Sequence, residues 1–220
     1  MKNVLFTSYI NNKNNKIIKS ILMEWKKLNP SYTILYFSDK DVDSFFSRTI
    51  HYDTFKKMRN GVTIADFFRI CYINKFGGYW FDIDLEPTNI NIPNYGNIHL
   101  FDVGYKNISY MFIGGKPNQK LFTRVIRRVK KNILDNIKIK KKHVLEITGP
   151  RIIQNIICSQ LNITNVDGCL PGNYESKIYL KDSIYEFVYT KIDIGVKKTD
   201  KYKKLQEMNN KKNYSHYDYI

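Results

Sequence analysis

The sequence contains little cysteine and no long apolar run. Its 220 residues include three cysteines, Cys71, Cys158 and Cys169, and no two of them have the C-x-x-C spacing of a metal or redox site. We therefore expect reduced thiols. No segment approaches the roughly 18 consecutive apolar residues of a transmembrane helix. The sequence thus predicts a soluble, cytoplasmic protein without a membrane span.

Acidic residues are also scarce relative to basic ones. The chain has 36 lysines and arginines against 20 acids, which gives a formal net charge of +16. The excess is lysine spread along the whole chain and is densest at 138–142 and 197–212. This balance favours polyanionic partners, so a basic nucleic-acid-binding protein is one hypothesis. The alternative is an AT-rich coding sequence, which enriches Lys, Asn, Ile and Tyr without any anionic ligand.

The size and apolar content of the chain predict one globular domain. Hydrophobic residues make up 43% of the sequence and aromatic residues 15%, enough to form a sizeable core. We find no internal repeat and no dividing linker, so we expect a single domain spanning residues 1–220. Apolar patterning predicts strands at 3–9, 33–37, 79–81, 99–105 and 109–115, and helices at 17–28, 40–46, 64–73, 119–134 and 152–159. The alternation of strands and helices requires an α/β fold with a largely parallel sheet covered on both faces.

The most informative stretch is 76–87. An apolar run, Tyr79–Phe81, leads into Asp82 and Asp84 and stops at Pro87, which is typical of a buried strand that delivers acids to a sheet edge. Residues two apart in a strand point to the same side. Two close carboxylates repel each other unless a cation lies between them, and all-oxygen ligation suits Mg²⁺ or Mn²⁺. We therefore predict that Asp82 and Asp84 bind a divalent cation.

A helix and a glycine pair precede this strand. Asp66 and Arg69 are three residues apart in the predicted helix and so lie at neighbouring positions of one face. Gly77 and Gly78 end the helix. The order is helix, glycine turn, buried strand and paired acids.

This unit of about two dozen residues resembles the sugar transferases of glycosyltransferase family 32 and the catalytic core of the large clostridial glucosylating toxins. Trp80 stands where the family usually has Tyr. Two shorter segments also resemble family motifs, Trp25 with Asn29-Pro30 and the turn Thr148-Gly149-Pro150. The family's pattern, A-x-x-S-D-x-x-R-x-x-x-L-x-x-x-G-G-x-Y-x-D-x-D, is met by Asp66, Arg69, Gly77, Gly78, Asp82 and Asp84, with Ala65 at its Ser position.

The resemblance implies a GT-A type fold with a Rossmann-like sheet. It also implies transfer of a sugar from a nucleotide-diphosphate sugar, with UDP or GDP as the nucleotide, to a glycan or protein acceptor, with retention of anomeric configuration. Under this reading Asp84 is the main ligand of Mn²⁺ or Mg²⁺, and Asp82 reaches the donor ribose and the ion. Arg69, fixed by Asp66, binds the donor sugar or diphosphate, which makes Asp82, Asp84 and Arg69 the expected catalytic set.

Further donor contacts are expected around these residues. The first strand of a nucleotide-binding α/β domain usually delivers base and ribose contacts at its carboxyl end, which here is Thr7, Ser8 and Tyr9. The resemblance adds Asp66, Trp80, Thr148 and Gly149 on the donor side. It also suggests His216 as a third metal ligand, because a histidine near the C-terminus fills a coordination position in several GT-A enzymes. Thr148 is in addition expected to cap the helix that follows Pro150.

Two departures from the family pattern concern the acceptor side. Tyr110 stands where the family has Asn, and Gln119 stands near its usual His. A protein that binds a nucleotide-sugar without transferring the sugar is therefore a second hypothesis. The nucleic-acid-binding hypothesis does not account for the paired acids, which would repel phosphate.

Overall fold

The computed structural model describes residues 3–9, 16–58, 60–90, 92, 97–102, 107–135, 144–160, 162, 164, 178–181, 186–191 and 203. The predictions for Cys169 and His216 lie outside these residues. The strands are β1 (Val4–Ser8), β2 (Thr33–Phe37), β3 (Gly78–Phe81), β4 (Ile98–Asp102), β5 (Ser109–Gly115), β6 (Ile178–Lys181) and β7 (Glu186–Lys191). The helices are α1 (Lys16–Leu28), α2 (Asp39–Phe46), α3 (Tyr52–Lys57), α4 (Gly61–Phe76), α5 (Lys120–Leu134), α6 (Val144–Ile147) and α7 (Arg151–Gln160).

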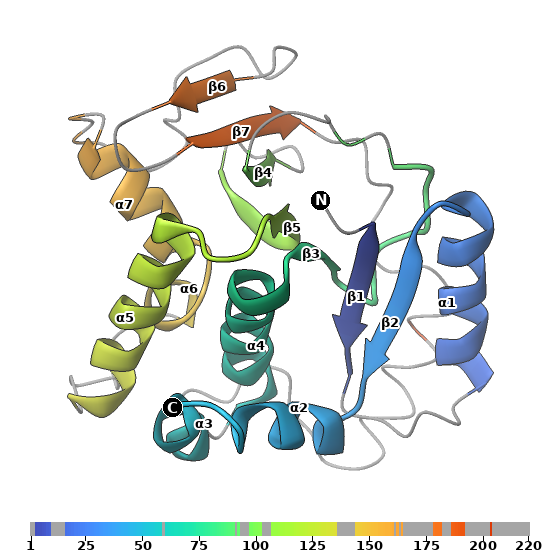
Figure 1. Cartoon of the computed structure of the whole chain (residues 1–220), viewed down its shortest axis with the longest axis horizontal. Coiled ribbons are helices and arrows are strands. Elements are labelled where there is room, and N and C mark those ends of the chain that lie inside the picture. The colour runs from blue at the N-terminus through green and yellow to red at the C-terminus, as the bar shows by residue number, and fades with distance from the viewer. Residues whose placement is uncertain are drawn as a thin grey trace.

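The strands form one sheet in the order β2-β1-β3-β5-β4-β7-β6 (Figure 1). β1 pairs in parallel with β2 and β3. β5 runs antiparallel to β3 and β4, and β7 is parallel to β4 and antiparallel to β6. The predicted α/β class, a Rossmann-like sheet flanked by helices, is confirmed, with the parallel β2-β1-β3 unit at one end of the sheet.

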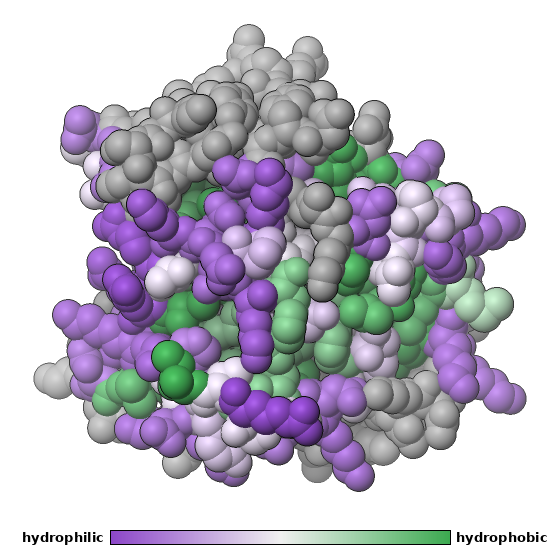
Figure 2. Space-filling model, in the orientation of Figure 1, coloured by the Kyte–Doolittle hydropathy of each residue, from purple (hydrophilic) through white to green (hydrophobic). Residues whose placement is uncertain are grey.

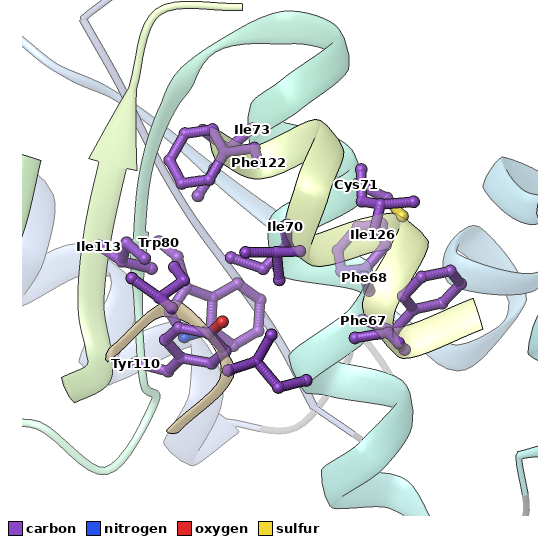
Figure 3. Packing of buried hydrophobic residues seen from close by; sticks show 14 of the residues in the cluster. Phe67, Phe68, Ile70, Cys71, Ile73, Trp80, Tyr110, Ile113, Phe122 and Ile126 are labelled. Atoms are coloured by element: carbon purple, nitrogen blue, oxygen red, sulfur yellow. The ribbon is translucent and has the colours of Figure 1, made fainter. Parts of the chain in front are cut away.

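Two apolar clusters lie on opposite faces of this sheet. Alternation along β3 sends Trp80 into the cluster formed with α4 and α5, and Tyr79 and Phe81 into the cluster formed with α1. Figure 3 shows the first cluster, in which Phe67, Phe68 and Ile70 of α4 pack near Trp80, Ile113 and Phe122. On the other face, α1 buries Ile18, Ile21 and Trp25 at helical spacing. Trp80 and the following Asp82 are thereby directed to the α4 side.

The helix boundaries follow local capping more than apolar periodicity. α4 begins three residues earlier than predicted, because the Asn60 side chain accepts a hydrogen bond from the Val62 amide (2.7 Å) and caps the helix there. α2 begins with a capping box between Ser38 and Asp41. α3 and α6 were not predicted, because helices of six and four residues have too few turns to show periodicity.

The glycine pair ends α4 and starts β3, as predicted. Gly77 and Gly78 have φ angles of +74° and +107°, a region that other residues rarely adopt. A Cβ atom on Gly78 would lie 3.1 Å from the Val4 carbonyl oxygen of β1. Glycine at this turn therefore lets β3 lie directly against β1. Among the described helices, none is long and apolar enough to cross a membrane.

Candidate active site

Asp82 lies in a turn directly after β3. Its backbone amide donates to the Met111 carbonyl (2.8 Å), and its carbonyl accepts from the Leu85 amide (3.0 Å). The expectation that Asp82 and Asp84 occupy alternate strand positions is therefore wrong, since β3 ends at Phe81. The alternation of burial persists, because Ile83 and Leu85 are buried and anchor the turn while both acids stay half-buried.

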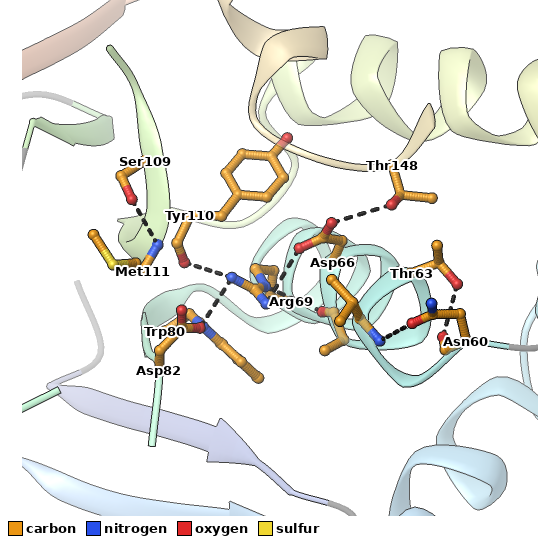
Figure 4. A network of polar contacts seen from close by, with 12 residues as sticks. Asn60, Thr63, Asp66, Arg69, Trp80, Asp82, Ser109, Tyr110, Met111 and Thr148 are labelled. Atoms are coloured by element: carbon orange, nitrogen blue, oxygen red, sulfur yellow. Dashed lines mark hydrogen bonds and ion pairs between the residues drawn. The ribbon is translucent and has the colours of Figure 1, made fainter. Parts of the chain in front are cut away.

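One oxygen of the Asp82 carboxylate is held by two donors from different elements (Figure 4). Trp80 Nε1 donates to Asp82 Oδ1 at 2.7 Å, and Arg69 Nη1 donates to the same atom at 3.1 Å. No residue that the structure describes donates to the other oxygen, Oδ2. The side chain is 22% exposed. Asp82 thus has one carboxylate oxygen fixed by the protein and a side chain that is partly open to solvent.

The buried Arg69 side chain connects three parts of the fold. Nη1 also donates to the Tyr110 carbonyl of β5 (2.6 Å), and Nε donates to the Ala65 carbonyl (3.2 Å). Nη2 forms an ion pair with Asp66 Oδ1 (3.2 Å), as the spacing predicted, and the guanidinium lies 4.4 Å from the centre of the Trp80 ring. The planar fork suits such multiple contacts. In this structure Arg69 contacts protein groups, and its contact with a donor stays a prediction.

Asp66 is a buried acid that joins α4 to the segment before α7. The Thr148 hydroxyl donates to Asp66 Oδ2 at 3.1 Å. Burial raises the pKa of Asp66 to about 6, and the nearby Asp82 also raises it, while Arg69 and the Thr148 hydrogen bond act in the opposite direction. The raised pKa of Asp66 puts its charge change close to neutral pH.

The turn at Thr148 differs from the prediction. Thr148 is fully buried and bonds Asp66, so it does not cap the next helix. α7 instead begins at Arg151, with its first hydrogen bonds made to the carbonyls of Gly149 and Pro150. A Cβ on Gly149 would lie 2.7 Å from Leu145 Cα of α6. Gly149 is therefore required for this close packing, and its contact with a donor stays a prediction.

Tyr110 contributes to the site through its backbone and its buried ring. The ring centre lies 5.7 Å from the Arg69 guanidinium carbon, and the hydroxyl is buried without a hydrogen-bond partner among the described residues. Burial raises the pKa of Tyr110 well above its ordinary value. The sequence analysis noted Tyr110 only as a departure from a pattern. A backbone carbonyl that accepts from Arg69 leaves no signature in the sequence.

The carboxyl end of β1 lies beside that of β3. Phe6 pairs with Trp80 in parallel register, so Thr7, Ser8 and Tyr9 follow at the edge where β3 leads into Asp82. Thr7 is fully buried, and its hydroxyl has no partner among the described residues. The Tyr9 carbonyl accepts from the Tyr36 hydroxyl (3.0 Å). The topology thus brings the predicted nucleoside contacts to the edge that carries the acids, and the contacts themselves stay predictions.

The residues that could hold a metal ion are the two acids of the turn. The described part of the chain contains no group of three or more His, Cys, Asp or Glu side chains able to hold an ion. Two carboxylates suit Mn²⁺ or Mg²⁺, which commonly keep further positions for water and for phosphate oxygens of a substrate. His216, the predicted third ligand, lies outside the described residues.

Comparison with known families and structures agrees with this arrangement. Residues 15–97, which include Asp66, Arg69, Asp82 and Asp84, match the model of a glycosyltransferase sugar-binding region containing a DXD motif. That match does not identify family 32. A search of the curated proteins finds no match.

The fold is that of known glycosyltransferase domains. The PaToxG glycosyltransferase superposes with a TM-score of 0.53 at 12% identity, covering 74% of this chain and 70% of that one. The UDP-bound glycosyltransferase domain of the YGT toxin gives a TM-score of 0.51 at 11% identity, with 75% and 68% covered. The ligand-free form of that domain gives a TM-score of 0.52 at 10% identity, covering 74% of this chain and 69% of that one. The family match and the fold together support a glycosyltransferase.

Proposed function

We propose that this protein is a metal-dependent glycosyltransferase that moves a sugar from a nucleotide-diphosphate sugar to a glycan or protein acceptor, with retention of anomeric configuration. The observation that carries the proposal is the orientation of Asp82. Trp80 and Arg69 hold one of its carboxylate oxygens, the other has no donor among the described residues, and Asp84 follows two positions later in the same turn. An acid oriented in this way suits a site that receives a cation and a diphosphate.

Asp84 and Asp82 would hold Mn²⁺ or Mg²⁺, with His216 as a possible third ligand. When bound, the ion offsets the negative charge that develops on the nucleoside diphosphate as it leaves. Two aspartates are enough protein ligands, because the diphosphate itself supplies further oxygens. The matched region of residues 15–97 contains both acids, which supports this assignment.

The chain's own residues would bind and orient the donor around this turn. At the end of β1 the partly exposed Ser8 would contact the nucleoside, supported by the buried Thr7 and Tyr9. The buried Thr148 and Gly149 would support the sugar side of the site. Arg69 would act mainly as a positioning residue for Asp82, because all of its contacts described above are with protein groups. A UDP-bound relative supports UDP as the first nucleotide to test.

A nucleotide-sugar-binding protein without transfer activity is the second candidate function. This candidate is favoured by two residues expected on the acceptor side. Tyr110 is buried, and the side-chain amide of Gln119, just before α5, donates to the Pro117 carbonyl (2.9 Å). Neither side chain reproduces the Asn and His of the related pattern. A nucleic-acid-binding function has no comparable support from the site.

The test is a panel of UDP- and GDP-sugars incubated with the protein and Mn²⁺, with release of free nucleotide as the readout. We expect release from at least one donor, abolished by EDTA and by Asp84→Asn. Asp43→Asn, which removes an exposed acid of α2, is the matched control and should release nucleotide at the wild-type rate. Mn²⁺-dependent binding of a donor without release would favour the binding function, and absence of binding would contradict both.

A further inference from the structure

A hollow in the surface lies on the side of α4 opposite to Asp66 and Arg69. It has a volume of about 270 Å³ and lies between α4, α5 and the segment that joins α2 to α3. At about 100° per residue, Cys71, Asn74 and Lys75 of α4 line it from a direction roughly opposite to Asp66 and Arg69. Cys71, Asn74 and Lys75 lie in the C-terminal part of α4, just before β3 begins. Asp82 and Asp84 instead follow the C-terminal end of β3. The hollow is therefore distinct from the donor site.

Two cations line this hollow, and the carboxylate in the adjoining hollow, that of Asp41, accepts hydrogen bonds from Ser38. Arg48 contributes from the segment after α2 and Lys75 from α4, and no acidic residue belongs to the lining. The Lys75 ammonium lies 5.5 Å from the centre of the Phe45 ring and 5.2 Å from that of Phe76. Among the described residues, no carboxylate forms an ion pair with Arg48 or Lys75. Their positive charge is therefore available to an anion from solution.

A third cation strengthens this field, and a histidine lies beside it. Lys130 of α5 donates to the Ile50 carbonyl (3.4 Å), next to the lining residues Thr49 and His51. Burial lowers the pKa of His51, and the charges of Lys130 and Lys75 lower it further. Burial and both charges therefore favour the neutral imidazole of His51.

Two residues that line the hollow carry buried polar atoms without partners. His51 Nδ1 and Asn74 Oδ1 make no hydrogen bond with any residue that the structure describes. A buried polar atom left in this way has lost its hydrogen bonds to water without replacement. When these side chains turn toward the hollow, a ligand hydroxyl would donate to the Asn74 oxygen or, in the tautomer protonated at Nε2, to His51 Nδ1.

We propose that this hollow, the Arg48–Lys75 pocket, binds a phosphorylated polyol, with the phosphate between the two cations and hydroxyls on His51 and Asn74. Its volume lies just below the range of about 300–1,000 Å³ for drug-sized ligands, which suits one phosphorylated ring.

This chemistry has two sources, a soluble sugar phosphate and the inositol phosphate headgroup of a lipid. Ile50, between two lining residues, exposes 86% of its surface and could enter a bilayer beside a lipid headgroup. Figure 2 shows hydrophilic side chains next to exposed apolar ones on the face that α2 to α5 present. A lipid source requires Ile50 to face the bilayer, whereas a soluble source does not.

The experiment has two arms with the full chain in EDTA. Calorimetry measures binding of glucose 6-phosphate, and co-sedimentation measures binding to phosphatidylcholine vesicles with and without phosphatidylinositol 4-phosphate. We expect binding in at least one arm, weakened at least tenfold in Arg48→Gln/Lys75→Gln. Ile50→Ser should weaken vesicle binding alone, which identifies the lipid source.

Two controls make the outcome decisive. Lys40→Gln/Lys57→Gln removes two exposed charges outside the pocket and should bind as the wild type does. Asp84→Asn, a change in the donor site, should also leave the binding of glucose 6-phosphate and of the vesicles unchanged. The proposal is overturned if neither probe binds, if the Lys40/Lys57 control loses as much affinity as the pocket variant, or if UDP competes with the probe, since the last result would place it in the donor site.

Discussion

Asp82 is the residue on which the polar contacts of the site converge. Its position depends on two donors, the indole of Trp80 and the guanidinium of Arg69, which approach the same oxygen from β3 and α4. Donors that share one acceptor fix the direction of the other oxygen. Trp at position 80 therefore has a structural role, because its indole N–H reaches the acid two residues later.

Trp80→Phe should lower activity more than stability. The variant keeps a buried ring and loses the hydrogen bond to Asp82, which contributes about 1.4 kcal/mol, or about tenfold in kcat/KM for the donor. Steady-state nucleotide release and the melting temperature are the two measurements. Unchanged kinetics would show that Arg69 alone orients Asp82.

The matched control for this variant is Trp25→Phe. Trp25 is also fully buried, and its ring lies 4.5 Å from that of Phe81. Its indole N–H has no partner among the described residues. The control should therefore lose a similar buried volume and keep wild-type kinetics.

Arg69→Lys should lower both stability and activity. Lysine keeps the charge, but a single ammonium cannot reach the Tyr110 carbonyl, Asp66 and Asp82 together. Losing about two charge-assisted hydrogen bonds should lower the free energy of unfolding by about 3 kcal/mol and nucleotide release by about 10- to 1,000-fold. Urea unfolding and kinetics measure the two effects. Arg127→Lys, on the exposed face of α5, is the control, and a lysine variant with wild-type values would contradict the positioning role.

Asp66 should make stability depend on pH. Its pKa is about 6 in the folded protein, against a reference value of 3.8, so the folded state keeps a proton that the unfolded state releases between these values. The stabilising contribution is therefore complete below pH 3.8 and is lost as the pH rises through about 6, by roughly 3 kcal/mol.

The comparison with Asp66→Asn isolates this contribution, because asparagine does not titrate. Urea unfolding from pH 4 to pH 7 should show the stability of the wild type falling relative to the variant as pH rises. A difference that stays constant, or that grows in favour of the wild type, would mean that the pKa of Asp66 is not raised by burial.

At the scale of elements, α4 is the part of the fold that organises the site. It is capped by Asn60, ended by Gly77 and packed against β3, β5 and α5. It supplies Asp66 and Arg69 from one face and lines the Arg48–Lys75 pocket from the other. The Asp66–Thr148 hydrogen bond fixes the α6–α7 segment to this helix.

Thr148→Val should loosen the segment from α6 to α7. The variant leaves Asp66 Oδ2 without its donor, which should cost about 1–2 kcal/mol, and amide exchange in residues 144–160 should accelerate. Thr63→Val is the control. The Thr63 hydroxyl is also buried and donates to the Asn60 carbonyl (2.7 Å), so its loss should weaken the start of α4 and leave exchange in 144–160 unchanged. Equal acceleration in both variants would contradict a specific connection at Thr148.

At the scale of the whole molecule, the order of the strands places the ends of β1 and β3 side by side. Parallel pairing of β1 with β2 and β3 brings three strand ends to one edge, where α/β proteins commonly bind ligands. The net charge of +16 gives the molecule as a whole a field that attracts anions. The paired acids at this edge would repel a diphosphate, which is the reason for the proposed cation.

UDP and Mn²⁺ together should stabilise the protein more than the sum of their separate effects. At a concentration 100 times Kd, a ligand adds about 2.7 kcal/mol, which corresponds to roughly 5–10 °C in Tm for a chain of this size. Thermal unfolding with each ligand, both ligands and EDTA measures the effect. Asp84→Asn should abolish the joint increment, and an increment that persists in EDTA would exclude a metal role in donor binding.

The sequence by itself determined the unit from Ala65 to Asp84 and the alternation of helices and strands. These features depend on neighbouring residues, since the Asp66–Arg69 pair needs only helical spacing and the glycine turn needs only two residues that tolerate positive φ. Burial of Tyr79 to Phe81 followed from their apolar run. The α/β class followed because alternating helices and strands pack stably in few ways.

Only the tertiary structure decided how these residues meet. The Trp80 and Arg69 contacts to Asp82 join β3 with α4, and Arg69 reaches the Tyr110 carbonyl across 41 positions of the chain. Thr148 donates to Asp66 Oδ2 and α7 begins three residues later, because the second oxygen of this buried carboxylate needs a donor in addition to Arg69. The turn at Asp82 likewise depends on the Met111 carbonyl of β5. Contacts between distant segments are set by packing in three dimensions, which no local pattern specifies.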